Sequence, residues 1–233
     1  MIKIENIEVY GWEAAIRGMR NPMNSWDKSD SYFDTNFYTT ETKDDYILNH
    51  TEDQWYIGEA DVKLMSKLSK AGSVHAKFRR FIDVTIDITA PLYWWKEFDT
   101  YKIGTVSNSC STMHKIHTKP FDINDFSTDH LYVKDSRGKC HYILPIDLMH
   151  NIIKVLNDYR ESFLQTMDKE DWWQMIQLLP SSYNQRRTIH LNYEVLSKIY
   201  SERKDHKLDE WRTFCDKIID MLPYSEELIA CEL

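Results

Sequence analysis

Several polar and cationic residues in this chain are of the types that bind a nucleotide. Arg186, Arg187 and Arg203 give local positive charge to a chain whose formal net charge is -8, and a guanidinium fork matches the oxygens of a phosphate. Asn192 and Arg203 are eleven residues apart, about three helical turns, so they share one face if this stretch is helical. Alternatively, Arg203 ends that helix, where the dipole favours a cation.

Two further groups have similar chemistry. Lys77, Arg79 and Arg80 form a cationic run that is either a solvated face or a contact to nucleotide phosphates. After Lys102 comes a run of small polar residues, too polar for a core and too short for a linker, which is typical of a ligand-binding loop. This polar run contains Gly104, Thr105, Ser107, Asn108, Ser109, Ser111 and Thr112.

A strand and an aromatic helix are predicted to hold the polar run in place. Apolar residues alternate with polar ones over residues 82–89, which predicts a strand with one face on a core. Ala90-Pro91 then ends the strand and can open a helix, because proline at the first helical position loses no needed N–H. The predicted helix carries Tyr93, Trp94, Trp95, Phe98 and Tyr101.

This strand, the Ala-Pro pair, the aromatic helix and the polar run together resemble the signature region of the flavin-dependent thymidylate synthases. The family motif reads R-H-R-x-x-S-x-N-E-x-S-x-R after such a helix. The Arg-His-Arg, the Glu and the last Arg of the motif are missing from this chain. With one residue inserted near Ser107, the matching positions are Thr100, Tyr101, Lys102, Thr105, Asn108-Ser109, Ser111 and Met113.

A second stretch resembles the family's other characteristic region, which has a Leu-Pro, a Tyr, and a helix that begins at an Asn with an Arg eleven residues later. In this chain these are Leu179-Pro180, Tyr183, Asn192 and Arg203. The resemblance implies that Asn192 touches a flavin and that Arg203 binds and polarises a pyrimidine ring. The short helix predicted over 12–20, with Arg17 and Arg20 on one side, also resembles a helix of the family. The arginine that the family has just before Leu-Pro is missing from this chain.

The resemblance implies methyl transfer from methylene-tetrahydrofolate to dUMP, with NADPH reducing FAD, in a homotetramer whose sites lie between subunits. Three hypotheses stay open: an active flavin enzyme, a diverged nucleotide binder without turnover, and an interaction protein that keeps only the frame. Arg203 is the candidate catalytic residue. Candidates for cofactor binding are Arg79, Tyr101, Lys102, Thr105, Asn108 and Asn192, and those for substrate binding are Ser109, Ser111, Arg186, Arg187 and Arg203.

The predicted fold is one α+β domain over residues 1–233, with a small antiparallel or mixed sheet and a flanking helical bundle. A first strand is expected over 1–10, with a slip of phase near Glu5-Asn6. Residues 21–57 and 118–142 are long excursions, and the aromatic residues of the former predict packing on the body or on a neighbouring subunit. Further helices are predicted over 59–71, 144–167, 170–179, from Asn192 to Arg203, and over 207–222.

Composition excludes several other classes. The acidic balance, with a pI of about 5.6, disfavours a nucleic-acid polymer as partner. With 6 glycines there is no glycine-rich phosphate loop, and neither a signal sequence nor a membrane span is evident. The four scattered cysteines predict free thiols in a cytoplasmic protein. His114 and His117 have no third ligand at useful spacing, so no metal site is expected.

Overall fold

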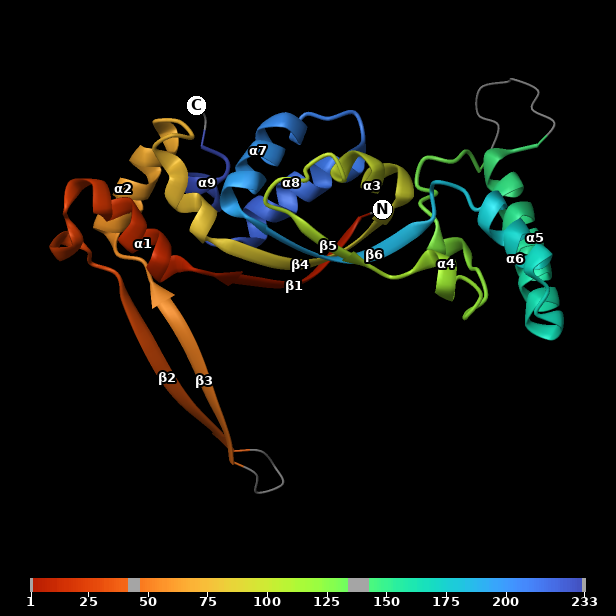
Figure 1. Ribbon diagram of the computed structural model, residues 1–233, viewed down its shortest axis with the longest axis horizontal. Helices are drawn as coiled ribbons and strands as arrows, with labels where there is room; N and C mark the ends of the chain where they lie inside the picture. Colours follow the sequence, from red (N-terminus) through yellow and green to blue (C-terminus); the bar gives the residue numbers. More distant parts are fainter. Residues whose placement is uncertain (1, 42–46, 134–142, 232–233) are drawn as a thin grey trace. The chain divides into compact units, whose positions relative to one another are not determined.

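The computed structural model describes residues 2–41, 47–133 and 143–231 (Figure 1). They form helices, a four-stranded sheet of order β1-β4-β6-β5 and a separate two-stranded sheet, so the predicted α+β class is confirmed. The strands of the larger sheet are β1 Lys3–Tyr10, β4 Asp83–Pro91, β5 Val106–Ser109 and β6 Asn184–Asn192.

The predicted helices are confirmed to within two residues at either end, except that the aromatic helix ends at Phe98, three residues before Tyr101. Residues 112–115 and 225–228 form short helices that the sequence pattern did not predict. No helix in the described ranges is both long enough and apolar enough to cross a membrane. The α-helices are α1 Trp12–Arg20, α2 Glu59–Lys70, α3 Leu92–Phe98, α4 Thr112–Lys115, α5 Pro145–Thr166, α6 Lys169–Leu178, α7 Tyr193–Arg203, α8 Asp209–Met221 and α9 Ser225–Leu228.

The chain forms two compact units, and each is assembled from segments that are distant in the sequence. The first unit consists of Met1–Ile7, Thr85–His190 and Lys207–Phe214, and the second of Glu8–Val84, Leu191–His206 and Cys215–Leu233. The single domain expected over residues 1–233 stays a prediction. Cys110, Cys215 and Cys231 are free thiols, whereas Cys140 lies outside the described residues.

The strand that precedes α3 follows its predicted pattern. Ile82, Val84, Ile86 and Ile88 are all buried, and the residues between them are partly exposed. The strand continues through Pro91, so the helix begins one residue later than expected. The first free N–H groups of α3 donate to main-chain carbonyls in residues 181–183, which ties this helix to the chain just before β6.

An aromatic cluster forms the core of the first unit. Trp94, Trp95 and Phe98 from α3 pack with Trp211 and Phe214 from α8, and all five side chains are buried. The ring centroids of Trp94 and Trp211 are 4.6 Å apart. Spacings of one, three and four residues place these rings on one side of each helix. The aromatic helix predicted from the sequence therefore has a packing role.

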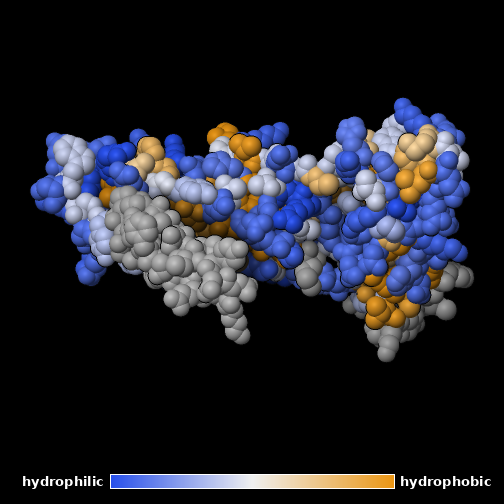
Figure 2. All heavy atoms as spheres, turned by 90° about the horizontal axis from the view of Figure 1, so that it is seen from below, coloured by the Kyte–Doolittle hydropathy of each residue, from blue (hydrophilic) through white to orange (hydrophobic). Residues whose placement is uncertain are grey.

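A second apolar cluster of the first unit lies between α5 and α6, where Leu156 and Met175 are fully buried. Several large apolar side chains of these helices are exposed. Figure 2 shows apolar residues at the surface of this part of the molecule. They include Leu148, Val155, Leu164, Met167 and Leu178.

The N-terminal strand shows the predicted slip of phase. Asn6 has a φ of 50°, in the left-handed region that asparagine tolerates better than most residues. At the end of the strand Gly11 has a φ of 90°, and a Cβ at this position would lie 1.8 Å from the carbonyl oxygen of Phe81. Glycine is therefore required at the junction of β1 and α1.

The long excursion over 21–57 contains a hairpin that the sequence pattern did not predict. Its strands, β2 Tyr32–Glu41 and β3 Ile47–Tyr56, pair antiparallel from Tyr32 opposite Tyr56 to Glu41 opposite Ile47. Residues 32–40 are rich in aromatic and β-branched types, which favour strands, but they lack the strict alternation of a strand with one buried face. The expected packing on the body or a neighbouring subunit stays a prediction.

The second predicted excursion, 118–142, is described only up to residue 133, and the turn expected at Ser136-Arg137-Gly138 lies outside the described residues. Its described part contains a short 3-10 helix, Ile123–Asp125, and a bridge between Phe126 and Tyr183. This bridge fixes the segment beside the start of β6.

A buried ion pair fixes the segment between α1 and β2. Arg20 Nε lies 2.6 Å from Asp61 Oδ1, and both side chains are buried. Asp61 Oδ2 also accepts hydrogen bonds from the hydroxyls of Ser29 and Ser31, at 2.7 and 2.6 Å. One carboxylate on α2 thus connects α1 with the segment that enters the hairpin.

We expect Asp61→Ala to lower the free energy of unfolding by about 3–5 kcal/mol, because Arg20 would stay buried without its counter-charge. Glu13→Ala is the matched control, since it removes the exposed pair of Glu13 with Arg17 and should cost no more than about 0.5 kcal/mol. Urea unfolding at neutral pH measures both values. Equal effects of the two substitutions would contradict this role of Asp61.

Candidate functional site

The pairing of β5 with β6 brings two separately predicted groups of residues together. Asn108 lies opposite Thr188 and Ser109 opposite Arg187, in antiparallel register. Beyond the strand, the Cys110 N–H donates to the carbonyl oxygen of Arg186 at 3.1 Å. The prediction that the polar run is a loop is therefore wrong for residues 106–109, which form an exposed edge strand.

A groove of about 280 Å³ opens where these two strands meet α4; we call it the β5–β6 groove. Ser111 caps α4 by accepting a hydrogen bond from the His114 N–H at 3.3 Å. The Gln185 side-chain amide donates to the Cys110 carbonyl oxygen and to Thr112 Oγ1, both at 3.0 Å. The groove is lined by Thr89, Cys110, Ser111, Thr112, Lys115, Ile116, Lys119, Asn124, Asp125, Tyr183, Asn184, Gln185 and Arg186.

The ionisable groups of the groove carry excess positive charge. Lys115, Lys119 and Arg186 line it together with one carboxylate, Asp125, which binds Lys119 and raises the pKa of its amino group. Burial, followed by the charge of Asp125, raises the pKa of Tyr183, so its hydroxyl stays protonated at neutral pH. The groove therefore suits an anion.

The two arginines of β6 have different surroundings. Arg186 is half exposed and its Nη2 lies 2.7 Å from Asp87 Oδ2. Arg187 is largely covered: its guanidinium lies 4.3 Å from the centre of the Trp95 ring and donates to Asp99 at 2.7 Å. Arg186 therefore lines the groove, whereas Arg187 holds β6 against α3.

The remaining candidates of the first unit lie at the end of α3 and in the segment after it. Tyr101 is largely buried and its ring packs near Phe98 and Trp211, at centroid distances of 6.3 and 6.1 Å. Lys102 is exposed. Thr105 Oγ1 is buried and has no hydrogen-bond partner within the part of the chain that the structure describes. Their predicted roles in cofactor binding stay predictions.

The other candidates belong to the second unit, where Arg79 is at the centre of a network. Arg79 donates to Glu194 Oε2, Ser197 Oγ and the Leu228 carbonyl oxygen, each at 2.9 Å. Its Nη1 also lies 3.6 Å from Cys231 Sγ. The network joins the 3-10 helix Ala76–Phe81, α7 and the C-terminal segment, so the charge of Arg79 is neutralised inside this unit.

A cleft of about 750 Å³ lies against this network; we call it the α7 cleft. Residues 194, 197, 198, 201 and 204 of its wall recur with helical spacing, so one face of α7 lines it, and Tyr200 lies beside that face. Ser69 is fully buried, and its Oγ has no hydrogen-bond partner among the described residues. The other walls come from Ser69, Gly72, Ser73, Arg79, Ile229, Ala230 and Cys231.

Asn192 and Arg203 stand at the two ends of α7. Asn192 is its N-cap, and its side-chain oxygen accepts the Val195 N–H at 3.1 Å. Arg203 is in the last turn, the position at which the helix dipole favours a cation. Burial raises the pKa of the Cys215 thiol to about 12, and the charge of Arg203 opposes this shift. The helix that was predicted to begin at Asn192 is confirmed.

Sequence reasoning missed the strand β6 and several lining residues. Ile189 and Leu191 are buried and alternate with exposed neighbours. This alternation is typical of a strand, but it is short because Arg186 and Arg187 precede it. Lys198 and Lys204 of the α7 cleft were missed, although their spacing from Glu194 along a helix could have found them. In the described ranges no three His, Cys, Asp or Glu side chains are grouped so as to hold a metal ion.

Comparison with known proteins was informative only for the fold. No protein-family model matches the chain, and no curated protein matches it. Thymidylate synthase X from Helicobacter pylori, crystallised with FAD and dUMP, superposes with a TM-score of 0.66 at 14% identity over 99% of both chains. The chain has the fold of the flavin-dependent thymidylate synthases.

Two further structures agree. A second Helicobacter pylori enzyme structure with FAD and dUMP has a TM-score of 0.63 at 14% identity, over 98% of this chain and 100% of the other. The UMP/dUMP methylase PolB from Streptomyces cacaoi, bound to 5-bromo-dUMP, has a TM-score of 0.56 at 12% identity, over 99% of this chain and 95% of the other. The likeness thus extends over nearly the whole chain.

We expect the free energy of unfolding at acidic pH to depend on Asp87. Its carboxylate accepts hydrogen bonds from Thr188, Arg186 and Asn6. These bonds, that of Thr188 first, lower its pKa from 3.8 to about 2. A lowered pKa stabilises the fold above pH 3.8, and this contribution is lost as the pH falls toward 2.

We expect Asp87→Asn to remove this loss, which solvent screening limits to about 1 kcal/mol. Thr188→Val should give an intermediate result, because it removes only the first of the three hydrogen bonds. Unfolding free energies measured between pH 2 and pH 6 test this, and identical profiles for Asp87→Asn and the unchanged protein would contradict it.

Proposed function

We propose that this protein binds a flavin and a pyrimidine nucleoside monophosphate and methylates the pyrimidine, in the manner of a flavin-dependent thymidylate synthase. The observation that carries the proposal is the likeness over 99% of both chains to an enzyme crystallised with FAD and dUMP. On this proposal NADPH and methylene-tetrahydrofolate are the co-substrates, as the resemblance in the sequence implies. The local chemistry of the two sites supports it.

The β5–β6 groove suits the phosphate of a nucleotide. Lys115, Lys119 and Arg186 place cations around it, and Ser111 and Thr112 add hydroxyls. Charge-assisted hydrogen bonds from a guanidinium to phosphate oxygens are among the stronger polar interactions in proteins. At about 280 Å³ the groove is close to the lower end of small-molecule sites, which start at about 300 Å³, so it suits a mononucleotide better than a dinucleotide.

The α7 cleft suits the larger cofactor. Its volume of about 750 Å³ is within the usual range for a cofactor site. Lys198 and Lys204 supply cations, and the unpartnered Ser69 hydroxyl supplies a donor. These residues fit a flavin that carries a pyrophosphate. When bound, the flavin supplies hydride chemistry, while Lys198, Lys204 and Ser69 bind and orient it.

The two ends of α7 have proposed roles in the same reaction. Asn192 meets the flavin, and Arg203 binds the pyrimidine and stabilises the charge that develops on its ring, as the resemblance implies. The Asn192 side-chain oxygen already accepts the Val195 N–H, so the amide nitrogen and the second lone pair of that oxygen are left for a ligand. Arg79 reaches a phosphate only by giving up part of its network with Glu194 and Ser197.

A nucleotide binder without turnover is the second candidate function. Thr100-Tyr101-Lys102 stands where the family has Arg-His-Arg, and Tyr101 packs into the aromatic core. Arg79, a candidate replacement for the lost charge, has its hydrogen bonds inside the chain. These contacts favour a chain that keeps the nucleotide groove and lacks the flavin.

We also propose that the protein is a homo-oligomer, as the resemblance implies for a tetramer. The exposed apolar side chains over α5 and α6 support it (Figure 2), because contiguous apolar surface is typical of an interaction site.

Flavin retention separates the two candidate functions. We expect the purified protein, mixed with FAD and freed of excess, to keep a visible flavin band, and Lys198→Gln with Lys204→Gln to weaken retention at least about tenfold, because each removes a charge-assisted contact. Lys63→Gln is the control, because the Lys63 side chain is exposed on α2. A folded protein that keeps no flavin would rule out the redox enzyme and leave the nucleotide binder or an interaction protein that keeps only the frame.

Calorimetry with dUMP tests the groove. Arg186→Gln should weaken dUMP binding about 10- to 100-fold, because it removes a charged phosphate contact, and should leave the weaker binding of deoxyuridine unchanged. Arg212→Gln is a matched control, since Arg212 is also half exposed and paired with an aspartate.

Arg203→Ala should weaken both ligands about tenfold or more, because both carry the pyrimidine ring. If Arg203→Ala left dUMP binding unchanged, both nucleotide hypotheses would fail, since each assigns the pyrimidine contact to Arg203.

A further inference from the structure

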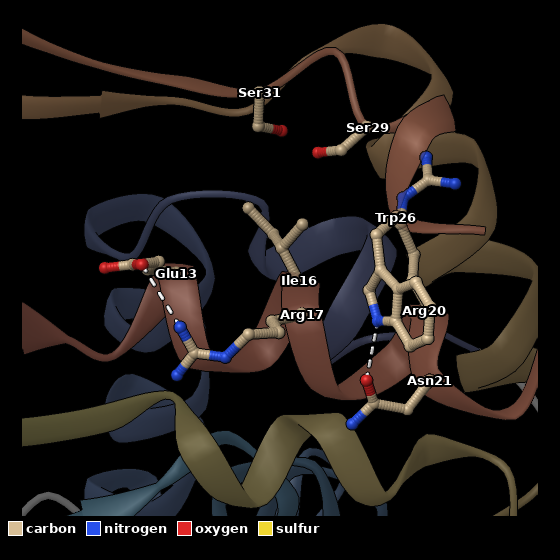
Figure 3. Close-up of a pocket in the computed structure, with 8 residues that line it drawn as sticks. All are labelled: Glu13, Ile16, Arg17, Arg20, Asn21, Trp26, Ser29 and Ser31. Carbon is tan, nitrogen blue, oxygen red and sulfur yellow. Dashed lines mark hydrogen bonds and ion pairs between the residues drawn. The ribbon is translucent and has the colours of Figure 1, made fainter. Parts of the chain in front are cut away.

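A third pocket, of about 540 Å³, lies in the second unit between α1 and the segment that leads into β2 (Figure 3). We call it the Trp26 pocket. None of its lining residues belongs to the β5–β6 groove or to the α7 cleft. It is therefore a different cavity from the proposed flavin and nucleotide sites.

Trp26 is a large apolar side chain in a fixed position at the surface. It is 52% exposed, yet its indole N–H donates to Asn21 Oδ1 at 2.7 Å, as Figure 3 shows. Its carbonyl oxygen accepts the Ser29 N–H at 3.1 Å. Because the N–H already has its acceptor, a ligand meets the flat face of the indole, which favours an aromatic ring.

Another part of the wall is fixed by the buried network around Asp61. The hydroxyls of Ser29 and Ser31 donate to Asp61, so their hydrogens are already used. Arg20 also lines the pocket, but its charge is neutralised by the same carboxylate. These walls are preformed, which lowers the cost of binding a ligand.

Arg17 is the lining cation that can turn to a ligand. Its side chain is 63% exposed, and it pairs with the equally exposed Glu13, four residues earlier and 3.2 Å away. Such a surface pair is weak, so exchanging it for a carboxylate on a ligand costs little. The guanidinium fork matches a carboxylate in two parallel hydrogen bonds. Ile16 adds apolar surface between Arg17 and the serines, as Figure 3 shows.

We propose that the Trp26 pocket binds a planar aromatic acid, with its ring stacked on the indole of Trp26 and its carboxylate paired with Arg17. The ring requires an apolar face, which Trp26 and Ile16 provide. The acid requires a cation that is not already neutralised in the core, which Arg17 provides. The site does not depend on the flavin or on the pyrimidine nucleotide.

The test uses the whole chain and three probes, followed by tryptophan fluorescence and calorimetry. We expect 2-naphthoate to bind. Cyclohexanecarboxylate, which has the charge without the ring, and 2-naphthol, which has the ring without the carboxylate, should each bind at least about tenfold more weakly, as expected from the loss of one stacking or one charged contact.

Substitutions of Trp26 and Arg17 test whether 2-naphthoate binds in the Trp26 pocket. Trp26→Leu should weaken 2-naphthoate at least about tenfold, whereas Trp26→Phe, which keeps a ring, should retain most of the binding. Arg17→Gln should weaken 2-naphthoate about fivefold or more and leave 2-naphthol unchanged. Retained binding in Trp26→Phe also shows that the pocket still folds.

Matched controls are Tyr10→Leu, which removes another exposed aromatic ring of the second unit, and Lys63→Gln, which breaks another exposed pair four residues apart. Neither should change 2-naphthoate binding. The proposal is overturned if 2-naphthoate fails to bind at millimolar concentration, or binds equally well to Trp26→Leu and Arg17→Gln. Equal binding of cyclohexanecarboxylate would also overturn it.

Discussion

The central position of β6 is the constraint on which the candidate nucleotide site depends. This strand lies between β4 and β5 in the sheet, although some 75 residues of chain separate β5 from β6. Its pairing sets Arg186 beside the end of β5, where Ser111 begins α4. A shift of one residue in this register would turn Arg186 to the other face of the sheet. The groove therefore exists only while this register is kept.

The arginines of this acidic chain divide into those that stabilise the fold and those that can meet a ligand. Arg20 and Arg79 are buried and neutralised by Asp61 and Glu194. Their charges are costly to expose to a ligand, since the fully buried Asp61 and the partly buried Glu194 would lose their partner. Arg186 is half exposed, and its partner Asp87 also accepts hydrogen bonds from Thr188 and Asn6, so Asp87 stays hydrogen-bonded if Arg186 turns to a ligand. Arg186 and Arg17, two of the proposed ligand contacts, are exposed arginines.

The aromatic helix α3 connects packing with function. Its tryptophans form the core with α8, and Trp95 also donates to the carbonyl oxygen of Gln185 at 2.9 Å. Arg187 stacks on the same ring. The core of the first unit thus holds the strand that carries Arg186. A substitution of Trp95 would therefore alter the position of β6 and, with it, the groove. The buried Tyr101 extends this packing into the position where the family motif has a histidine.

The sequence by itself determined the local elements of this protein. Alternation over 82–89 predicted β4, and the aromatic spacing predicted the apolar side of α3, because both depend on neighbouring residues only. It also indicated the fold through the order of weak motifs. Only the tertiary structure decided that Asn108 and Ser109 belong to an edge strand, that Arg186 lines a groove, and that Arg79 is neutralised by Glu194. These outcomes depend on pairing between distant segments and on burial, which no local pattern encodes.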